Sequence, residues 1–317
     1  MRILYFFTGY RGEPHLIIDF VLGLSKYCDV FVYGPFEQEF NGKEISPLHY
    51  EEDKPLKEVI DVIKPDLILL AEYHMLINKI KRYEDLSKIN YIPKVSIELD
   101  CYNLAEAPTW HSLMGVDFVV ARAPFKKSFF SVPSIWLPNY VPDEFYLKEF
   151  TKNRFNKIIF LGNGRFSSSI YYAVRKRAIF LLERNDMLDY FPSQSFVIYR
   201  DYLRKYKCGL SCSFFSLNMA PAKNWEIPGS GCLLFTSDFI GRELIFGEKL
   251  FIEYKNDCSD IIEKAEDILT NDYDELAYEA WKVVGEKHLQ SIRVKELYNA
   301  LNSVLKNEQV EDKWNIN

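Results

Sequence analysis

The sequence has few of the residues from which metal and disulfide sites are built. Its six cysteines include no Cys-x-x-Cys pair, and its five histidines have no metal-ligand spacing. Most of the cysteines lie in apolar runs, where a buried thiol behaves as a small hydrophobic residue. We therefore predict reduced cysteines and no bound metal.

Two further absences narrow the class of protein. No stretch reaches the roughly 18 apolar residues that a membrane helix needs, and the apolar run at the N-terminus meets Gly9 too early for a signal peptide. The net charge is −6, so a nucleic-acid track would require a local basic patch. These absences predict a cytoplasmic protein without a membrane span.

The composition is that of a folded globular protein. Apolar residues make up 48% and charged residues 26% of 317 residues, a length that favours two domains. In the first half, apolar runs alternate with amphipathic segments, which is typical of βα units on a parallel sheet. Strands are predicted at 3–7, 30–33, 67–70, 94–98 and 118–121, and helices at 16–27, 55–63 and 75–90.

A second βα series follows a proline-containing segment. Pro138 and Pro142 interrupt any helix or central strand and predict a crossing between domains. After it we predict strands at 157–162, 209–214, 232–236 and 249–252, and helices at 171–184, 258–269, 274–287 and 291–306. The simplest α/β arrangement is two Rossmann-like domains that face each other across a cleft, where a ligand would bind.

The most informative stretch is Lys223-Asn-Trp-Glu226-Ile-Pro-Gly229-Ser230-Gly231, directly before an apolar strand. A carboxylate there can accept both hydroxyls of a ribose, while Lys223 and backbone N–H groups of the glycine turn can hold a diphosphate. The alternative is a helix that ends in a glycine cap, with Glu226 as a surface charge.

This motif, followed by Glu243-Leu-Ile-Phe-Gly and Phe251-Ile-Glu-Tyr, resembles the C-terminal half of group-1-like glycosyltransferases related to spore maturation proteins. The turn at Phe160-Leu-Gly-Asn163, with Arg175 in the next helix, resembles the phosphate-facing loop of that family. The resemblance covers residues 136–306 and implies the GT-B fold. It further implies an acceptor-side domain at 1–137, a nucleotide-sugar-binding domain at 138–290, and a C-terminal helix and tail at 291–317 that return towards the first domain.

The resemblance also implies the roles of individual residues. Glu226 would hold the donor ribose, and Lys223 with the Gly229–Gly231 backbone would face the diphosphate. Arg175 would be a second cation beside the Asn163 turn. The resemblance implies no metal, because that family usually requires none, and no cofactor, because the UDP-, GDP- or dTDP-linked sugar is a co-substrate. Lys223 stands where the family more often has Arg, and an ammonium lacks the planar fork of a guanidinium.

Candidate catalytic residues lie in the first half. Asp100 ends the strand at 94–98 and is our choice of general base for an inverting transfer, with Glu98 as a further candidate. Glu13 and His15 follow the first strand and would also line the site. The alternatives are a helix cap for Asp100 and a tight βα turn for the other two. A retaining mechanism would need no such base.

The sequence predicts a metal-independent glycosyltransferase acting on a glycan, lipid-linked or small-molecule hydroxyl. One alternative acceptor is a hydroxylated DNA base. Two competing hypotheses are a nucleotide-sugar epimerase or hydrolase, and a non-catalytic spore-coat-like protein. Asp272-Tyr-Asp274 matches the metal-binding Asp-x-Asp pattern of other glycosyltransferases, but acidic residues at a helix start explain it.

Overall fold

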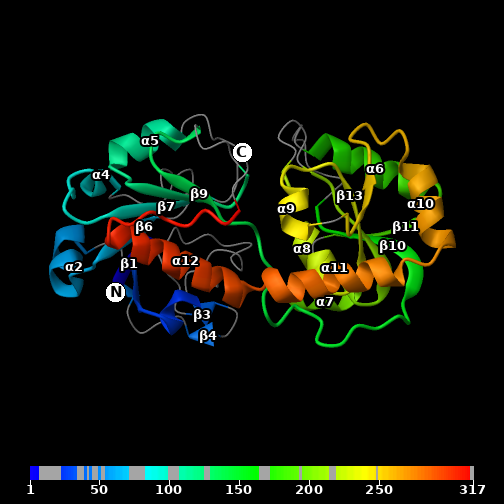
Figure 1. The fold of residues 1–317 in the computed structure, drawn as a ribbon, viewed down its shortest axis with the longest axis horizontal. Coiled ribbons are helices and arrows are strands. Elements are labelled where there is room, and N and C mark those ends of the chain that lie inside the picture. The colour runs from blue at the N-terminus through cyan, green and yellow to red at the C-terminus, as the bar shows by residue number, and fades with distance from the viewer. Residues whose placement is uncertain are drawn as a thin grey trace. The chain divides into compact units, whose positions relative to one another are not determined.

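The computed structural model describes residues 1–6, 23–33, 39–40, 43–44, 49–50, 54–70, 83–98, 107–124, 129–163, 172–192, 195–213, 219–247 and 249–314. The chain divides into two compact units (Figure 1). Unit 1 contains Met1–Pro138 and Ser291–Asn317, and unit 2 contains Asn139–Gln290. These divisions lie beside the boundaries predicted after residues 137 and 290.

Unit 1 contains a parallel sheet with the strand order β5-β2-β1-β6-β7-β8-β9. Its strands are β1 (Arg2–Phe6), β2 (Asp29–Tyr33), β5 (His49–Tyr50), β6 (Leu67–Leu70), β7 (Lys94–Glu98), β8 (Phe118–Ala121) and β9 (Ser134–Trp136). Strands β6, β7 and β8 are buried along their whole length, as expected when both faces of a parallel sheet are covered. The strands predicted at 67–70, 94–98 and 118–121 are confirmed, whereas β9 was not predicted.

The remaining described elements of unit 1 are helices and one small antiparallel pair of strands. They are η1 (Leu24–Lys26), the antiparallel pair β3 (Glu39–Phe40) and β4 (Lys43–Glu44), α2 (Leu56–Ile63), α4 (Tyr83–Leu86), α5 (Ala107–Met114) and α12 (Gln290–Leu305). Helix α2 places Leu56, Val59, Ile60 and Ile63 on one buried face, and Lys64 ends it in the left-handed conformation. Of the helix predicted at 75–90, residues 75–82 lie outside the described residues, and α4 ends at Leu86, where the chain turns.

Unit 2 contains a second parallel sheet, with the order β11-β10-β12-β13-β14. Its strands are β10 (Phe155–Leu161), β11 (Leu188–Phe191), β12 (Tyr206–Leu210), β13 (Leu233–Ser237) and β14 (Ile252–Tyr254). The predictions near 157–162 and 232–236 are confirmed. Strand β12 begins earlier than the predicted 209–214. Polar Lys207 lies between buried neighbours there, so a search for a continuous apolar run misses the start of the strand. The edge strand β11 is only partly buried and was not predicted.

Helices cover this second sheet on both faces (Figure 1). They are α6 (Ala173–Arg184), α7 (Phe196–Leu203), α8 (Lys223–Gly229), α9 (Arg242–Phe246), α10 (Ile261–Thr270) and α11 (Asp274–Lys287). Helices α6 and α10 pack against each other, and α8 and α11 pack together against β13. No helix in the described ranges is both long and apolar enough to cross a membrane.

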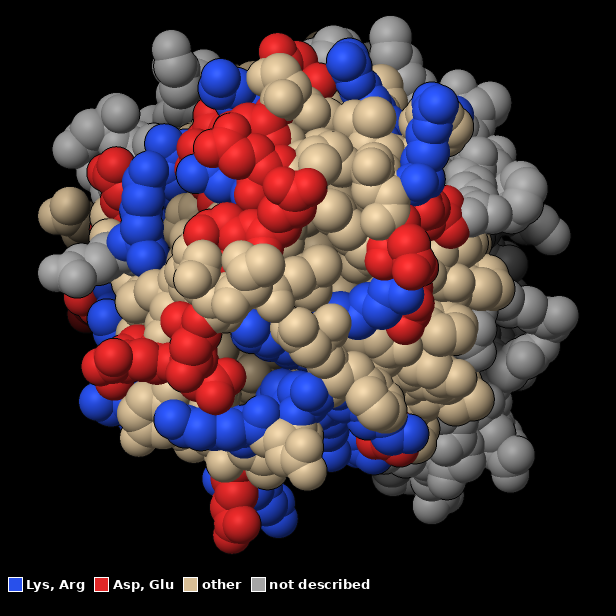
Figure 2. Space-filling view, turned by 90° about the vertical axis from the view of Figure 1, so that its right-hand side faces the viewer, with Lys and Arg blue, Asp and Glu red and all other residues tan. Residues whose placement is uncertain are grey.

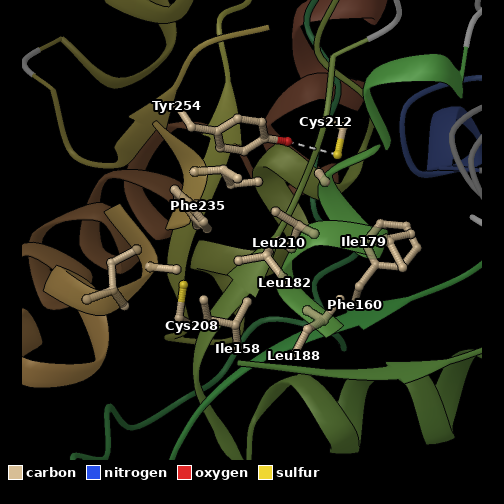
Figure 3. Packing of buried hydrophobic residues seen from close by; sticks show 14 of the residues in the cluster. Ile158, Phe160, Ile179, Leu182, Leu188, Cys208, Leu210, Cys212, Phe235 and Tyr254 are labelled. Atoms are coloured by element: carbon tan, nitrogen blue, oxygen red, sulfur yellow. Dashed lines mark hydrogen bonds between the residues drawn. The ribbon is translucent and has the colours of Figure 1, made fainter. Parts of the chain in front are cut away.

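The core of unit 2 lies between its sheet and the α6–α10 layer (Figure 3). Phe160 of β10, Leu210 of β12 and Phe235 of β13 are each at most 1% exposed. At the carboxyl end of β12, the Tyr254 hydroxyl donates to the Ser211 carbonyl over 2.8 Å and contacts the Cys212 sulfur at 2.9 Å. The carboxyl ends of these strands are therefore supported by a closely packed layer of apolar side chains.

Candidate functional site

Helix α8 carries the motif that stands out in the sequence. Trp225 and Ile227 are each 1% exposed and anchor the helix. Ile227 packs so closely on β12 that a Cβ at Gly209 would lie 2.8 Å from it, so only glycine fits there. With that face buried, Lys223 and Glu226 share the opposite, half-buried side, as residues three apart on a helix do.

Lys223 lies at the carboxyl end of β10. Its ammonium nitrogen is 5.6 Å from the centre of the Phe160 ring and 4.6 Å from the centre of the Tyr199 ring. It also lies against Gly162, which has a φ of +127° and turns the chain out of the strand. The structure therefore brings Lys223 next to the turn that leads to Asn163, and their membership of one site stays a prediction.

Arg175 is the second cation at this place, and it is almost buried at 9% exposed. Its guanidinium carbon lies 4.3 Å from the Tyr172 ring centre and 5.7 Å from that of Phe160, and Nη1 donates to the Asn163 carbonyl over 3.3 Å. Its Nε is buried without a hydrogen-bond partner in the described chain. A buried donor without a partner destabilises the folded state. An anionic ligand that accepts a hydrogen bond from this donor would remove that cost.

The two cations both lie against the ring of Phe160, and both act electrostatically on the thiol of Cys212. Burial raises the pKa of the Cys212 thiol to about 11, while the charges of Arg175 and Lys223 both lower it. Both charges are therefore within electrostatic reach of one thiol at the end of β12. Two side-chain cations therefore lie near this end of the sheet, where they could attract an anion.

Glu226 is held by a residue that the sequence did not single out. The Tyr199 hydroxyl, from α7, donates to Glu226 Oε2 over 2.7 Å, and Lys223 Nζ donates to the same hydroxyl over 3.4 Å. No local pattern marks Tyr199, because α7 reaches α8 only through the fold. Glu226 is thus neither an isolated surface charge nor part of the buried core.

The glycine turn after α8 has a different environment from the one predicted for it. The N–H of Ser230 donates to the Glu226 and Ile227 carbonyls, and the N–H of Gly231 donates to the Pro228 carbonyl. Gly229 packs on Val141, and a Cβ at Gly231 would lie 2.5 Å from Arg154. This geometry corrects the expectation that the Gly229–Gly231 backbone faces a diphosphate, because the amides of Ser230 and Gly231 already close the helix.

Asn224 is a polar group of α8 that the sequence motif did not mark as functional. It is fully buried, and Ser211 Oγ donates to its Oδ1 over 2.6 Å. Its Nδ2 has no hydrogen-bond partner in the part of the chain that the structure describes. Together with Arg175 Nε, this gives two buried donors without acceptors near the same strand ends.

The predicted catalytic residues Glu13, His15 and Asp100 lie outside the described residues. Glu98, the further candidate for the base, is described and is 1% exposed. Its Oε1 lies 2.7 Å from His111 Nε2 and accepts from Ser96 Oγ over 2.7 Å. This buried cluster gives Glu98 a structural environment, which argues against its direct contact with an acceptor.

The Asp272-Tyr-Asp274 segment begins α11. The Asp272 side chain accepts from the backbone N–H of Asp274 over 2.9 Å, as expected for acidic residues at a helix start. Within the described ranges, no three His, Cys, Asp or Glu side chains are grouped as metal ligands.

No protein family and no curated protein matches the sequence. Solved structures do match the fold. A glycosyltransferase from Rickettsia africae has a TM-score of 0.66 at 12% identity, covering 97% of this chain and 99% of that one. HepE from Anabaena, in complex with UDP and glucose, has a TM-score of 0.64 at 12% identity and coverages of 96% and 100%.

A third similar structure belongs to another class of enzyme. It is a Listeria monocytogenes protein described as a UDP-N-acetylglucosamine 2-epimerase, with a TM-score of 0.55, 12% identity and 98% of both chains covered. At such low identities the likeness concerns the fold alone. The chain therefore has the α/β fold of the GT-B glycosyltransferases, with two parallel sheets.

Proposed function

We propose that this protein is a nucleotide-sugar-dependent glycosyltransferase that moves a sugar from a nucleoside diphosphate to an acceptor hydroxyl. The observation that carries the proposal is the grouping of Arg175, Lys223 and Glu226 at the strand ends of unit 2. Two cations beside a carboxylate suit a ligand that is anionic at one end and carries hydroxyls at the other.

In the proposed site, Glu226 accepts hydrogen bonds from the donor ribose. Lys223 and Arg175 neutralise the diphosphate, with the exposed Asn163 turn beside them. Charge develops on the diphosphate as the glycosidic bond breaks, so preorganised cations lower the barrier of that step. With side-chain cations in this role, we expect turnover to persist in EDTA.

Unit 1 supplies the acceptor side in this proposal. Asp100 takes the proton of the attacking hydroxyl, and Glu13 and His15 lie beside the acceptor. The acceptor is a glycan, a lipid-linked sugar or a small molecule. Figure 2 shows acidic and basic side chains on one face, with basic ones gathered along its lower part, and the net charge of −6 gives no general attraction to a DNA acceptor.

An epimerase is the second candidate, and the likeness to the Listeria protein supports it. An epimerase or hydrolase consumes the donor without an acceptor, whereas a transferase requires one. Loss of UDP-sugar in the absence of any acceptor would favour this second candidate. A protein that binds no nucleotide at all would instead be the non-catalytic alternative.

The proposal is tested by binding of UDP, GDP, dTDP and their sugar conjugates. UDP is the first choice because the similar HepE structure is a complex with UDP and glucose. A ligand that binds only the folded state raises the melting temperature. We expect Glu226→Ala to weaken binding by about 1 to 3 kcal/mol, the loss expected when hydroxyls lose a charged partner.

Glu243→Ala is the matched control, because Glu243 is an exposed carboxylate of unit 2. We expect it to bind the nucleotide like the wild type. Unchanged affinity in Glu226→Ala would remove Glu226 from the site, and no binding by the wild type would reject the enzyme assignment.

A further inference from the structure

Tyr199 contacts both charged groups of α8 from a different helix. Its hydroxyl donates to Glu226 Oε2 over 2.7 Å and accepts from Lys223 Nζ over 3.4 Å. The Lys223 ammonium also lies 4.6 Å from the centre of the Tyr199 ring. One side chain therefore sets the position of a cation and of a carboxylate.

Helix α7, which carries Tyr199, is fastened to a neighbouring segment. Arg204 Nη2 donates to the carbonyls of Phe145 and Tyr146 over 3.0 and 3.3 Å, and Arg200 Nη1 donates to that of Glu144 over 3.4 Å. Leu203 is buried beneath the helix. The Tyr199 ring therefore projects from a support that is fixed at several points.

Lysine and glutamate side chains lose much rotamer freedom when a ligand orders them. A rigid phenol that holds both in advance removes part of that entropic cost. The hydroxyl can serve both groups, since its single proton goes to the carboxylate while its lone pairs accept from the ammonium.

We propose that Tyr199 is a positioning residue that arranges Glu226 and Lys223 for the ribose and the diphosphate of the donor. This inference rests on the proposed function, because it assigns those two groups to the donor. Tyr199 itself does not contact the reacting atoms. Through Glu226 it acts on donor affinity, and through Lys223 it also acts on the charge that develops on the leaving diphosphate.

The test is Tyr199→Phe, which keeps the ring under Lys223 and removes the hydroxyl. Tyr202→Phe is the matched control: Tyr202 lies on the same helix, is half-buried, and packs its ring on Phe191. With UDP as the probe, or GDP or dTDP if one of those stabilises the wild type, we expect about tenfold weaker binding in Tyr199→Phe. Tyr202→Phe should stay within about twofold.

A double-mutant cycle separates positioning from a general loss of structure. In the Glu226→Ala background, Tyr199→Phe should weaken nucleotide binding much less than in the wild type, because part of the positioned pair is gone. At saturating donor, kcat of Tyr199→Phe should fall together with kcat/KM, because Lys223 loses its fixed place beside the diphosphate on which charge develops. The melting temperature without ligand should be nearly unchanged.

Failure of the positioning role is distinguishable from failure of the proposed function. Equal nucleotide affinity in wild type and Tyr199→Phe overturns the positioning role and leaves the proposed function intact. Additive effects of Tyr199→Phe and Glu226→Ala also overturn it, because they show no coupling. If the wild type binds none of the nucleotides, the proposed function is rejected and the role of Tyr199 with it.

Discussion

At the carboxyl end of β7 in unit 1, Glu98 is 1% exposed and bonded to Ser96 and His111, whereas Lys223 and Glu226 at the strand ends of unit 2 are half-buried. In both places, titratable side chains lie at the carboxyl ends of strands in a parallel sheet. In unit 1 the pair is closed off from solvent, although Glu98 Oε2 and His111 Nδ1 have no hydrogen-bond partner among the described residues. In unit 2, Tyr199 holds Lys223 and Glu226 on a side of α8 that solvent reaches. Titratable groups at a strand end are therefore insufficient for a ligand site, which also needs access from solvent.

The largest effect should come from Asp100→Asn in unit 1. Loss of a general base typically costs about a hundredfold or more in turnover, because the acceptor hydroxyl keeps its proton. We expect kcat to fall by about that factor, with nucleotide affinity unchanged, in steady-state assays and calorimetry. Asp85→Asn, which removes an exposed partner of Lys88, serves as the control. Full activity of Asp100→Asn would transfer the base role elsewhere or indicate a retaining mechanism.

His111→Ala tests whether the Glu98 cluster is structural. Removal of one partner leaves Glu98 buried with less compensation, which should destabilise unit 1 by about 3 kcal/mol. Urea unfolding followed by tryptophan fluorescence measures the loss, and Ser112→Ala on the exposed side of α5 is the control. Nucleotide affinity at low temperature should persist. A variant as stable as the wild type would refute the structural role and reopen a catalytic role for Glu98.

Arg175→Ala tests whether the buried cation of unit 2 belongs to a ligand site. We expect about tenfold weaker nucleotide binding, since a diphosphate would lose one of two cations. Arg177→Ala removes an exposed arginine from the same helix and should leave affinity unchanged. Calorimetry on both variants makes the comparison. Equal affinities would assign Arg175 to packing against Tyr172 and Phe160 only.

The smallest effect is a difference in alkaline pH dependence between the units. In unit 2, burial raises the pKa of Cys212 to about 11 and of Cys232 to about 12, from an ordinary value of 9.0. Above pH 9 the unfolded chain loses these protons first, so the folded state binds more protons and unit 2 loses stability as the pH rises. Burial of Tyr254 acts in the same direction.

In unit 1, burial lowers the pKa of Lys94 below 10.5. Between its folded and unfolded pKa values the unfolded chain binds more protons, so this group adds stability with rising pH. Cys28, with a pKa raised to about 11, partly offsets it. A pH of about 10 lies in the window between the folded and unfolded pKa values. Raising the pH from 8 to about 10 should therefore lower the urea midpoint of unit 2 more than that of unit 1. An equal fall in both units would show that these pKa shifts do not set the difference in stability between the units.

The sequence predicted the central strands well because their signal is local. A continuous apolar run such as Leu67–Leu70 requires cover on both faces wherever it lies in the sheet. Strands β9 and β11 were missed because they are short or half-buried. The start of β12 was misplaced for a related reason, since Lys207 interrupts its apolar pattern.

The candidate site was predicted only in part. Lys223, Glu226 and Arg175 stood out from their residue types and the family resemblance, and the structure brings the two cations together at Phe160. The glycine turn was assigned to the diphosphate because glycine permits close approach, but it approaches Val141 and Arg154 instead. A sequence motif cannot reveal which neighbour a turn will meet.

The two βα series, the crossing between them and the charged motif of α8 could be predicted without a structure, because each depends on the order of residues along the chain. Packing between separate elements, by contrast, buries Arg175 against Phe160 and places Gly229 and Gly231 against Val141 and Arg154. It alone also joined Tyr199 to Lys223 and Glu226. These contacts arise where separate helices pack on one sheet, and no local pattern encodes that meeting.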